Sequence, residues 1–377
     1  MSNQVHHGLE GVFAGESAIC DVDQSSGGLR YRGYAIEDLA EHAVFEEVVY
    51  LLLMGSLPNQ RAFSEFQGQL VRGRVIPPHL FDFLQGIPAP VNRMDALRTA
   101  VSYLGMEDPD HTLNTHEANL RKAIRLVAQM PSLLAALHVH EGGDPALMQR
   151  SAGSHAEHLL TILTGARPDP FSVKALDVAL ILYAEHEFNA STFAARVTAS
   201  SLSDMHSAVV SGIGTLKGPL HGGANEAVMD MLFEVDRAGD VRKYLSEKFS
   251  KKERIMGFGH RVLKKGDPRS DIIQRYSKEL GERRSETKWY DYAIQIEKIM
   301  REEKGFYPNL DFYSASVFYL LNLPAPLYTP LFVCSRIAGW AAHVIEQHDQ
   351  NRLIRPRCLY VGEKKMAFVP LSERNKG

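Results

Sequence analysis

The run Leu331–Gln347, LFVCSRIAGWAAHVIEQ, is a largely apolar segment, and it is a strong indication of the fold of this chain. Its residues Val333, Ile337 and Trp340 recur at spacings of four and three, which is the period of a helix packed into a core. Arg336 lies in the middle of this segment. Because a buried guanidinium is costly without a partner, we expect Arg336 to meet a carboxylate of the protein or of a ligand.

Helical periodicity continues through most of the chain. Further segments with this spacing are Glu226–Asp236, Val241–Phe249, Asp271–Leu280, Tyr290–Arg301 and Phe312–Leu321. Strand signals are few, and the best is 18–32, in which Ser25-Ser-Gly-Gly can turn a short hairpin. No internal repeat and no linker rich in Gly, Ser or Pro divides the sequence. We therefore predict an all-α protein.

Length and composition exclude several classes of protein. The 377 residues provide material for two or three domains, and 45% hydrophobic with 23% charged residues is typical of a globular chain. A net charge of -3 argues against a general binder of nucleic acid or acidic membranes. We see no membrane-spanning run and no secretory signal. Three scattered cysteines fit a reducing compartment, so we expect a cytoplasmic protein.

A basic island spans 251–269, with seven basic residues against two acidic ones. It contains Gly257-Phe-Gly-His260, followed by Asp267-Pro-Arg269. Glycines let backbone N–H groups approach an anion closely, although neither a Walker A loop nor a Rossmann fingerprint is present. The island favours an anionic ligand, with a solvated charged helix end as the alternative.

Two further residues are candidates for acid–base chemistry. His221, in Gly218-Pro-Leu-His221-Gly-Gly, precedes a helical segment whose dipole disfavours imidazolium, so a neutral hydrogen-bond donor is expected there. The alternative is a histidine that only caps a turn. Asp311 enters an apolar segment, where desolvation raises a carboxyl pKa toward that of a general base. The alternative for Asp311 is a helix N-cap.

Metal chemistry has little support. The pair His155 and His158 has metal-like spacing but lacks a persuasive third ligand, and no HExxH motif occurs. The dipeptide His348-Asp349 is a weak signal for an all-α, HD-type metal phosphohydrolase. We expect no metal site, and that phosphohydrolase and a helical scaffold without catalysis are the rival functions.

Several ordered motifs together resemble the citrate synthase family over nearly the whole chain. They are Leu29-Arg-Tyr-Arg-Gly33, His186-Glu-Phe-Asn-Ala-Ser-Thr192, Gly218-Pro-Leu-His-Gly-Gly223, Gly257-Phe-Gly-His260 with Asp267-Pro-Arg269, Asn309-Leu-Asp311, Ser335-Arg336 and Ile354-Arg355-Pro356. The resemblance implies an all-α homodimer with a large helical domain (1–220 and 316–377) and a smaller inserted domain (221–315). The active site would lie in the cleft between these domains.

The resemblance also implies an acyltransferase that condenses acetyl-CoA with oxaloacetate and hydrolyses citryl-CoA to citrate and CoA. Asp311 would remove the methyl proton, His221 would donate to the enol oxygen, and His260 would polarise the oxaloacetate carbonyl. The implied oxaloacetate residues are His186, His260, Arg269, Arg336 and, from the other subunit, Arg355. The implied CoA residues are Met256, Gly257, Phe258, Gly259, Lys264 and Asn309. No permanently bound cofactor, metal, nucleic acid or membrane is implied.

The nearest alternative lies inside the family. A 2-methylcitrate synthase would use propionyl-CoA with the same residues, and one extra methylene is worth only about 1–3 kcal/mol in an apolar pocket. The form Gly218-Pro-Leu-His221 resembles citrate synthases, whereas Ala315 stands where many of them have glycine. We favour acetyl-CoA and keep propionyl-CoA as the alternative.

Overall fold

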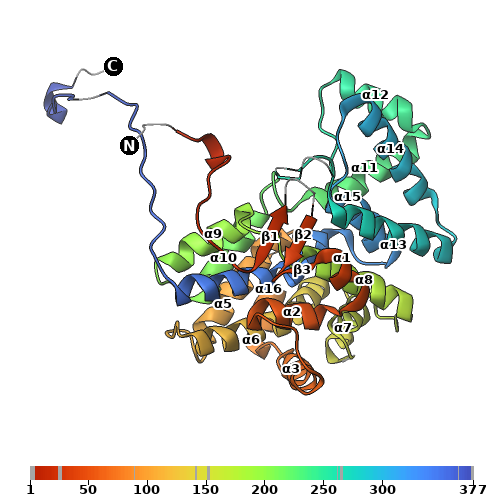
Figure 1. Ribbon diagram of the computed structural model, residues 1–377, viewed down its shortest axis with the longest axis horizontal. Coiled ribbons are helices and arrows are strands. Elements are labelled where there is room, and N and C mark those ends of the chain that lie inside the picture. Colours follow the sequence, from red (N-terminus) through yellow and green to blue (C-terminus); the bar gives the residue numbers. More distant parts are fainter. Residues whose placement is uncertain are drawn as a thin grey trace.

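The computed structural model describes residues 5–23, 28–88, 90–140, 142–150, 153–260, 262–263, 266–363 and 365–374. In these residues the secondary structure is mainly helical, and the predicted all-α class is confirmed (Figure 1). The helices are α1 Ile36–His42, α2 Phe45–Met54, α3 Gln60–Arg72, α4 Pro78–Gln85, α5 Arg93–Glu107, α6 His116–His140, α7 His155–Thr164, α8 Pro170–Tyr183, α9 Ala190–Ser200, α10 Met205–Leu216, α11 Ala224–Ala238, α12 Val241–Ser250, α13 Pro268–Arg284, α14 Lys288–Lys304, α15 Leu310–Leu320 and α16 Tyr328–Asp349.

A small antiparallel sheet precedes the helices. Its strands are β1 Cys20–Asp23, β2 Gly28–Tyr31 and β3 Tyr34–Ala35, in the order β1-β2-β3. Cys20 pairs with Tyr31, so the predicted hairpin within 18–32 is confirmed. Residues 25–27 of the predicted turn lie outside the described residues.

Two groups of helices build the molecule. Helices α1 to α10 and α16 form one group, while α11 to α15 gather beside them (Figure 1). Each of the five segments predicted between 226 and 321 overlaps one helix of the second group. The run 331–347 lies within α16, which packs against α2, α6, α8, α9 and α10 and is buried along nearly its whole length. This explains why its sequence is apolar on all sides.

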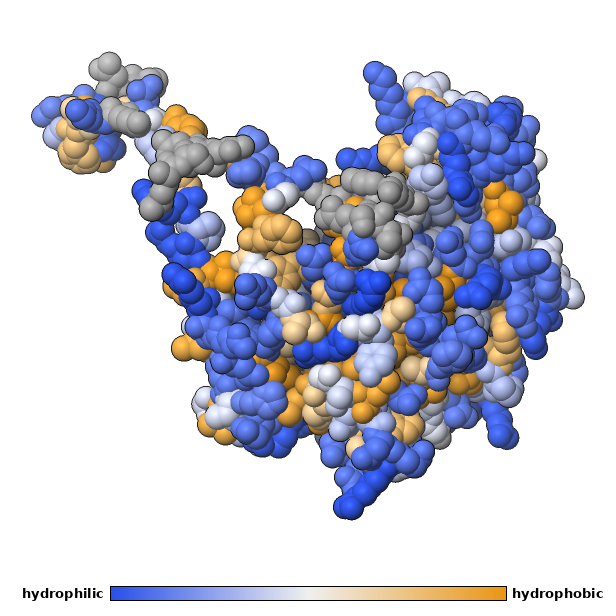
Figure 2. Space-filling model, viewed as in Figure 1, coloured by the Kyte–Doolittle hydropathy of each residue, from blue (hydrophilic) through white to orange (hydrophobic). Residues whose placement is uncertain are grey.

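The chain ends differ from this compact body. Residues 5–17, 351–363 and 365–374 run outward from it, largely without regular structure (Figure 1). They expose large apolar side chains (Figure 2), which are Val5, Leu9, Val12, Phe13, Leu353, Leu359, Tyr360, Val361, Met366, Phe368, Val369 and Leu371. In the described part of the chain, no helix is both long and apolar enough to span a bilayer.

Helix α16 crosses the end of α8 at Gly339. A methyl group at Gly339 would collide with the carbonyl oxygen of Ala184 and with Oε2 of Glu185. Both of these residues are fully buried, and the segment that contains them leads directly into His186. The absence of a side chain at Gly339 therefore allows α16 to approach the segment that carries a candidate site residue.

We expect Gly339→Ala to lower the free energy of unfolding by about 2–4 kcal/mol, because an added methyl overpacks a buried crossing. Denaturant titration measures this. Gly214→Ala in α10 is the matched control, since its new methyl would lie 3.7 Å from Nη1 of Arg98, an ordinary contact. The control should be neutral or stabilising, by up to about 1 kcal/mol. Equal losses in the two variants would contradict the crossing argument.

Candidate active site

Six of the predicted site residues gather at one place in the structure. They lie after α8, in the segments that precede α11 and α13, at the start of α13 and α15, and in α16, and they are His186, His221, His260, Arg269, Asp311 and Arg336. The rings of His186 and His260 are 4.8 Å apart between centroids. The charges of Arg269 and Arg336 act on both His186 and Asp311.

Asp311 lies in the first turn of α15. The N-cap of that helix is Asn309, whose Oδ1 accepts the N–H of Asp311 at 3.1 Å, so the N-cap alternative for Asp311 is wrong. The Tyr183 hydroxyl donates to Oδ1 of Asp311 at 2.6 Å. Burial raises the pKa of Asp311 to about 6, and the hydrogen bond from Tyr183 and the charges of Arg269 and Arg336 limit that rise. Asp311 is therefore a buried carboxyl group that is still ionised at neutral pH.

His221 lies in the turn before α11. Burial lowers its pKa to about 4, with the charge of Arg336 as a second cause, so the ring is neutral. Desolvation, and not the helix dipole that the sequence suggested, is thus the main reason. Nε2 of His221 lies 2.8 Å from Oγ of Ser191 and 3.3 Å from the backbone nitrogen of Ser191. Because a backbone N–H only donates, Nε2 accepts and the ring proton resides on Nδ1.

Two further histidines are held as neutral rings. Nδ1 of His260 accepts backbone N–H groups from Val262 at 3.1 Å and Leu263 at 2.9 Å, which places the ring proton on Nε2. Burial, followed by the charge of Arg269, lowers the pKa of His186 far below its usual range. Within the described residues, Nε2 of His186 is buried and has no hydrogen-bond partner. A buried polar atom without a partner is suited to receive a polar ligand.

Arg269 is held by Asp267, the N-cap of α13. Asp267 accepts from Nε of Arg269 at 2.9 Å and from Nη2 at 2.8 Å, and its second oxygen also accepts the N–H of Leu310. Burial tends to raise the pKa of Asp267, but the charge and hydrogen bonds of Arg269 lower it below its usual value. This pair ties the start of α13 to the start of α15. Only Nη1 of Arg269 faces a weaker partner, the carbonyl of Leu182 at 3.5 Å.

Arg336 has a different kind of partner from the one expected. Its Nε donates to the carbonyl of Tyr183 at 2.7 Å, and its guanidinium carbon lies 4.7 Å from the ring centre of Phe332. Among the described residues no carboxylate is hydrogen-bonded to Arg336, although Glu185 acts on it electrostatically. Burial lowers the pKa of Arg336. A carboxylate from a ligand, the other partner expected from the sequence, stays a prediction.

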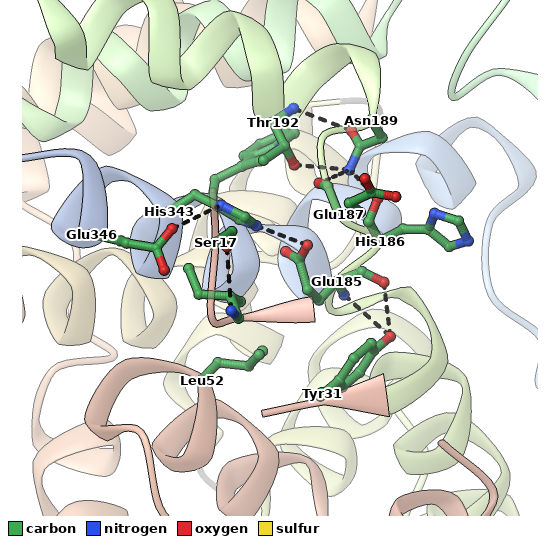
Figure 3. A network of polar contacts seen from close by, with 12 residues as sticks. Ser17, Tyr31, Leu52, Glu185, His186, Glu187, Asn189, Thr192, His343 and Glu346 are labelled. Atoms are coloured by element: carbon green, nitrogen blue, oxygen red, sulfur yellow. Dashed lines mark hydrogen bonds and ion pairs between the residues drawn. The ribbon is translucent and has the colours of Figure 1, made fainter. Parts of the chain in front are cut away.

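A second polar network lies under the site (Figure 3). Nδ1 of His343 accepts from Arg196 at 3.0 Å, so Nε2 of His343 donates to Oε1 of Glu185 at 2.9 Å. Both the His343 and Glu185 side chains are fully buried. The ring of His186 points away from this network (Figure 3). Sequence reasoning missed Tyr183, Glu185 and His343, although ionisable residues in apolar helical runs were the available signal.

The predicted CoA loop is braced by the residues before α15. Gly259 donates its N–H to the carbonyl of Tyr307 and Asn309 donates to Gly257, each at 2.9 Å. Gly257 and Gly259 have φ of +80° and +81°, a region that favours glycine. Phe258 forms the bridge to Pro308 between them. Met256 precedes this braced turn, and Lys264 lies outside the described residues.

Arg355 does not join the other predicted residues. It is exposed on the segment that follows α16, and that segment leads away from α11 to α15 (Figure 1).

A surface cavity of about 630 Å³ lies away from the predicted site, between the start of α8 and the end of α13. Phe171 and Arg283 help to line it, and none of the predicted site residues does.

A family model described as "Citrate synthase, C-terminal domain" matches residues 8–357. The chain belongs to the citrate synthase family. It is 47% identical over 369 residues to citrate synthase 2 of Bacillus subtilis strain 168, covering 97% of this chain and 98% of the relative. It is also 43% identical over 371 residues to a 2-methylcitrate synthase of Shewanella oneidensis, covering 97% of each chain.

Solved citrate synthase structures have the same fold. A citrate synthase of Thermoplasma acidophilum, in a ternary complex with carboxymethyl coenzyme A and oxaloacetate, superposes with a TM-score of 0.93 at 33% identity, covering 99% of this chain and all of that one. The enzyme of Thermotoga maritima gives 0.87 at 37% identity, with 99% and 100% covered. The predicted family, its two-domain all-α fold and its acyltransferase class are confirmed.

The rival functions from other classes are wrong for this citrate synthase family member. His348, the basis of the phosphohydrolase alternative, is used structurally: its Nδ1 lies 2.9 Å from Asn119 and its Nε2 lies 3.1 Å from the carbonyl of Ser203. Its neighbour Asp349 pairs with His116 at 2.8 Å. In the described part of the chain, no group of three or more potential ligands has a geometry that could hold a metal ion.

We expect Asp267→Asn to lower the free energy of unfolding by about 3–5 kcal/mol, because it leaves the buried charge of Arg269 without a carboxylate. Chemical denaturation measures the loss. Asp236→Asn is the control: Asp236 pairs with Lys288 at 2.7 Å, but both side chains are more than a third exposed. Breaking such a pair should cost less than about 1 kcal/mol. A cost at Asp267 as small as that at Asp236 would contradict the structural role of the buried pair.

Proposed function

We propose that this protein condenses acetyl-CoA with oxaloacetate and then hydrolyses citryl-CoA to citrate and CoA. The observation that carries the proposal is the buried carboxyl of Asp311, with its pKa raised to about 6, beside two buried arginines. Making a carbon nucleophile from a thioester methyl requires such a base and a donor at the thioester oxygen. His221 supplies the donor.

The chemical steps follow from the two protonation states. Asp311 is ionised at neutral pH yet more basic than an ordinary carboxylate, so it accepts the methyl proton. His221 is neutral, and its Nδ1–H donates to the oxygen that becomes the enol. One preorganised donor of this kind is worth about 10²–10³ in rate.

Oxaloacetate is a dianion, and the site offers it cationic and neutral donors. Nη1 of Arg269 and the guanidinium of Arg336 bind its carboxylates, because Asp267 and Tyr183 already occupy the other nitrogens. His186 contributes a buried Nε2 without a partner. Nε2–H of His260 polarises the reacting carbonyl and stabilises the alkoxide.

In this proposal, CoA and oxaloacetate lie on opposite sides of Asp311. Residues 256–259 form the CoA loop, Asn309 lies close to the pantetheine arm, and Lys264 lies near the phosphates. The basic island then faces the polyanion. We assign 221–315 to a small domain that closes over the large domain, 1–220 and 316–377. Asp311 belongs to the small domain and α16 to the large one in this assignment, so closure would move Asp311 relative to α16. CoA is a substrate here, and no permanently bound cofactor is needed.

The active enzyme is a homodimer in this proposal. The exposed apolar side chains of 5–17 and 351–374 need a partner surface, and a second copy of the chain supplies one. Arg355 lies on the second of these segments, away from its own site. It therefore completes the oxaloacetate site of the other subunit.

We also propose a cytoplasmic location. The structure describes Cys20, Cys334 and Cys358 as free thiols. Disulfides form and persist in oxidising compartments, so three unpaired cysteines fit a reducing one.

A thiol-release assay with oxaloacetate decides the acyl substrate. We expect kcat/KM to be higher with acetyl-CoA than with propionyl-CoA. Relatives of both kinds match at similar identity, and one methylene changes the preference by only about 10–200-fold, so both substrates must be measured. A clear preference for propionyl-CoA would establish the alternative, a 2-methylcitrate synthase. No thiol release with either would refute the proposed reaction.

Asp311→Asn should reduce thiol release by about 10²–10⁴-fold, because the base is lost while the arginines remain. Calorimetry with oxaloacetate alone should show binding within about threefold of that of the original protein. Retained turnover would show that another residue is the base.

Mixing Arg355→Ala protein with Asp311→Asn protein tests the shared site. Subunit exchange gives mixed dimers in which one site carries both substitutions and the other carries neither, so about a quarter of all sites should regain activity at equal amounts. Sedimentation verifies the dimers. If mixed dimers form and activity stays absent, Arg355 and Asp311 serve one site within a single subunit.

A further inference from the structure

Tyr183, the last residue of α8, touches two groups of the site at once. Its hydroxyl is 2.6 Å from Oδ1 of Asp311 and 2.6 Å from Oγ of Ser314. Its backbone carbonyl accepts from Nε of Arg336 at 2.7 Å. The ring is buried and packs against Phe332 at 4.4 Å between centroids.

The direction of these hydrogen bonds follows from the number of protons available. Burial, followed by the charge of Asp311, raises the pKa of Tyr183 well above its usual value, so the phenol keeps its proton. A carboxylate only accepts, so Tyr183 donates to Asp311. A phenol has one hydrogen, so the Ser314 hydroxyl is the donor across its 2.6 Å contact with Oη of Tyr183, which is shorter than its 3.3 Å contact with the carbonyl of Asp311. The result is a chain from Ser314 through Tyr183 into the carboxylate.

Several charged groups act on Asp311 besides Tyr183. They come from the start of α13 and from α16, and they are Arg269, Asp267 and Arg336. Helices α11 and α14 also pack against α15. Two of their carboxylates have other partners: Glu226 accepts from the N–H of Thr329, and Glu297 accepts from the hydroxyl of Tyr313. The site histidines are neutral and add no charge near Asp311. Tyr183 is a neutral donor that is hydrogen-bonded directly to the carboxylate of Asp311.

We propose that Tyr183 is a positioning residue for the base Asp311. Its hydroxyl fixes Oδ1 and favours the ionised carboxylate, which leaves Oδ2 to face the substrate methyl. During enolisation the proton moves from the methyl carbon to Asp311, the C–H electron pair forms the carbon–carbon double bond, and the carbonyl π pair moves onto the thioester oxygen. The product is an enolate that accepts a hydrogen bond from Nδ1–H of His221, and Tyr183 keeps its own proton. This inference rests on the proposed function and adds the group that sets the working state of its base.

Tyr183→Phe removes the hydroxyl and keeps the ring and the carbonyl. In a plot of kcat/KM for the acyl-CoA against pH, the acidic limb reflects protonation of Asp311. Its midpoint should lie near pH 6 in the original protein. Loss of a hydrogen bond to the charged form raises a carboxyl pKa, so the limb should move up by about one pH unit. KM for oxaloacetate should stay within about twofold, because the carbonyl that holds Arg336 is retained.

Two variants in α15, the helix that carries Asp311, make the test specific. Ser314→Ala removes the donor to Tyr183 and should move the limb in the same direction by a smaller amount. Tyr313→Phe is the matched control, because its hydroxyl contacts Gln274 and Glu297 instead of Asp311, and its limb should stay in place.

The outcomes separate this inference from the proposed function. A folded, active Tyr183→Phe enzyme with an unmoved limb overturns the inference and leaves the proposed function intact. An equal shift in Tyr313→Phe also overturns it, because the effect would then be a general loss of packing. If Tyr183→Phe does not fold, Ser314→Ala decides, and an unmoved limb there overturns the inference. An original protein without thiol release overturns both.

Discussion

The structure depends on burying two guanidinium groups next to one carboxyl group in a helical interior. Arg269 is neutralised by Asp267, which at the same time begins α13 and receives the N–H of Leu310 at the start of α15. Arg336 has only a carbonyl as its hydrogen-bonded partner among the described residues. Because an uncompensated buried charge is costly, this arrangement favours an anionic ligand. The proposed substrate, a dianion, meets that need.

Burial sets the protonation states of the site with opposite effects on acids and bases. Desolvation disfavours the charged form, so it lowers the pKa of His221 to about 4 and raises that of Asp311 to about 6. One physical effect thus produces a neutral donor and a more basic carboxylate from ordinary side chains. Hydrogen bonds then limit the shift at Asp311, which is the part assigned to Tyr183.

A layer of packing and polar contacts beneath the site keeps these groups in place. Gly339 lets α16 approach the segment that contains Glu185, and the Glu185–His343 pair binds the two together (Figure 3). Arg336 lies on the same helix, one turn before Gly339. Any displacement of α16 against the end of α8 would therefore move the arginine that we propose binds the substrate.

The sequence by itself determined the helical class, the short hairpin and the family, since helical periodicity and motif residues are local properties of the chain. It also supplied the proposed residues of the site, but not their partners. Tyr183 and Asp311 are 128 positions apart, and only the packing of α8 against α15 brings them together. The same reason explains why the carbonyl partner of Arg336 could not be predicted. Local patterns specify elements, whereas charge partners and pKa values depend on burial, which only the tertiary structure decides.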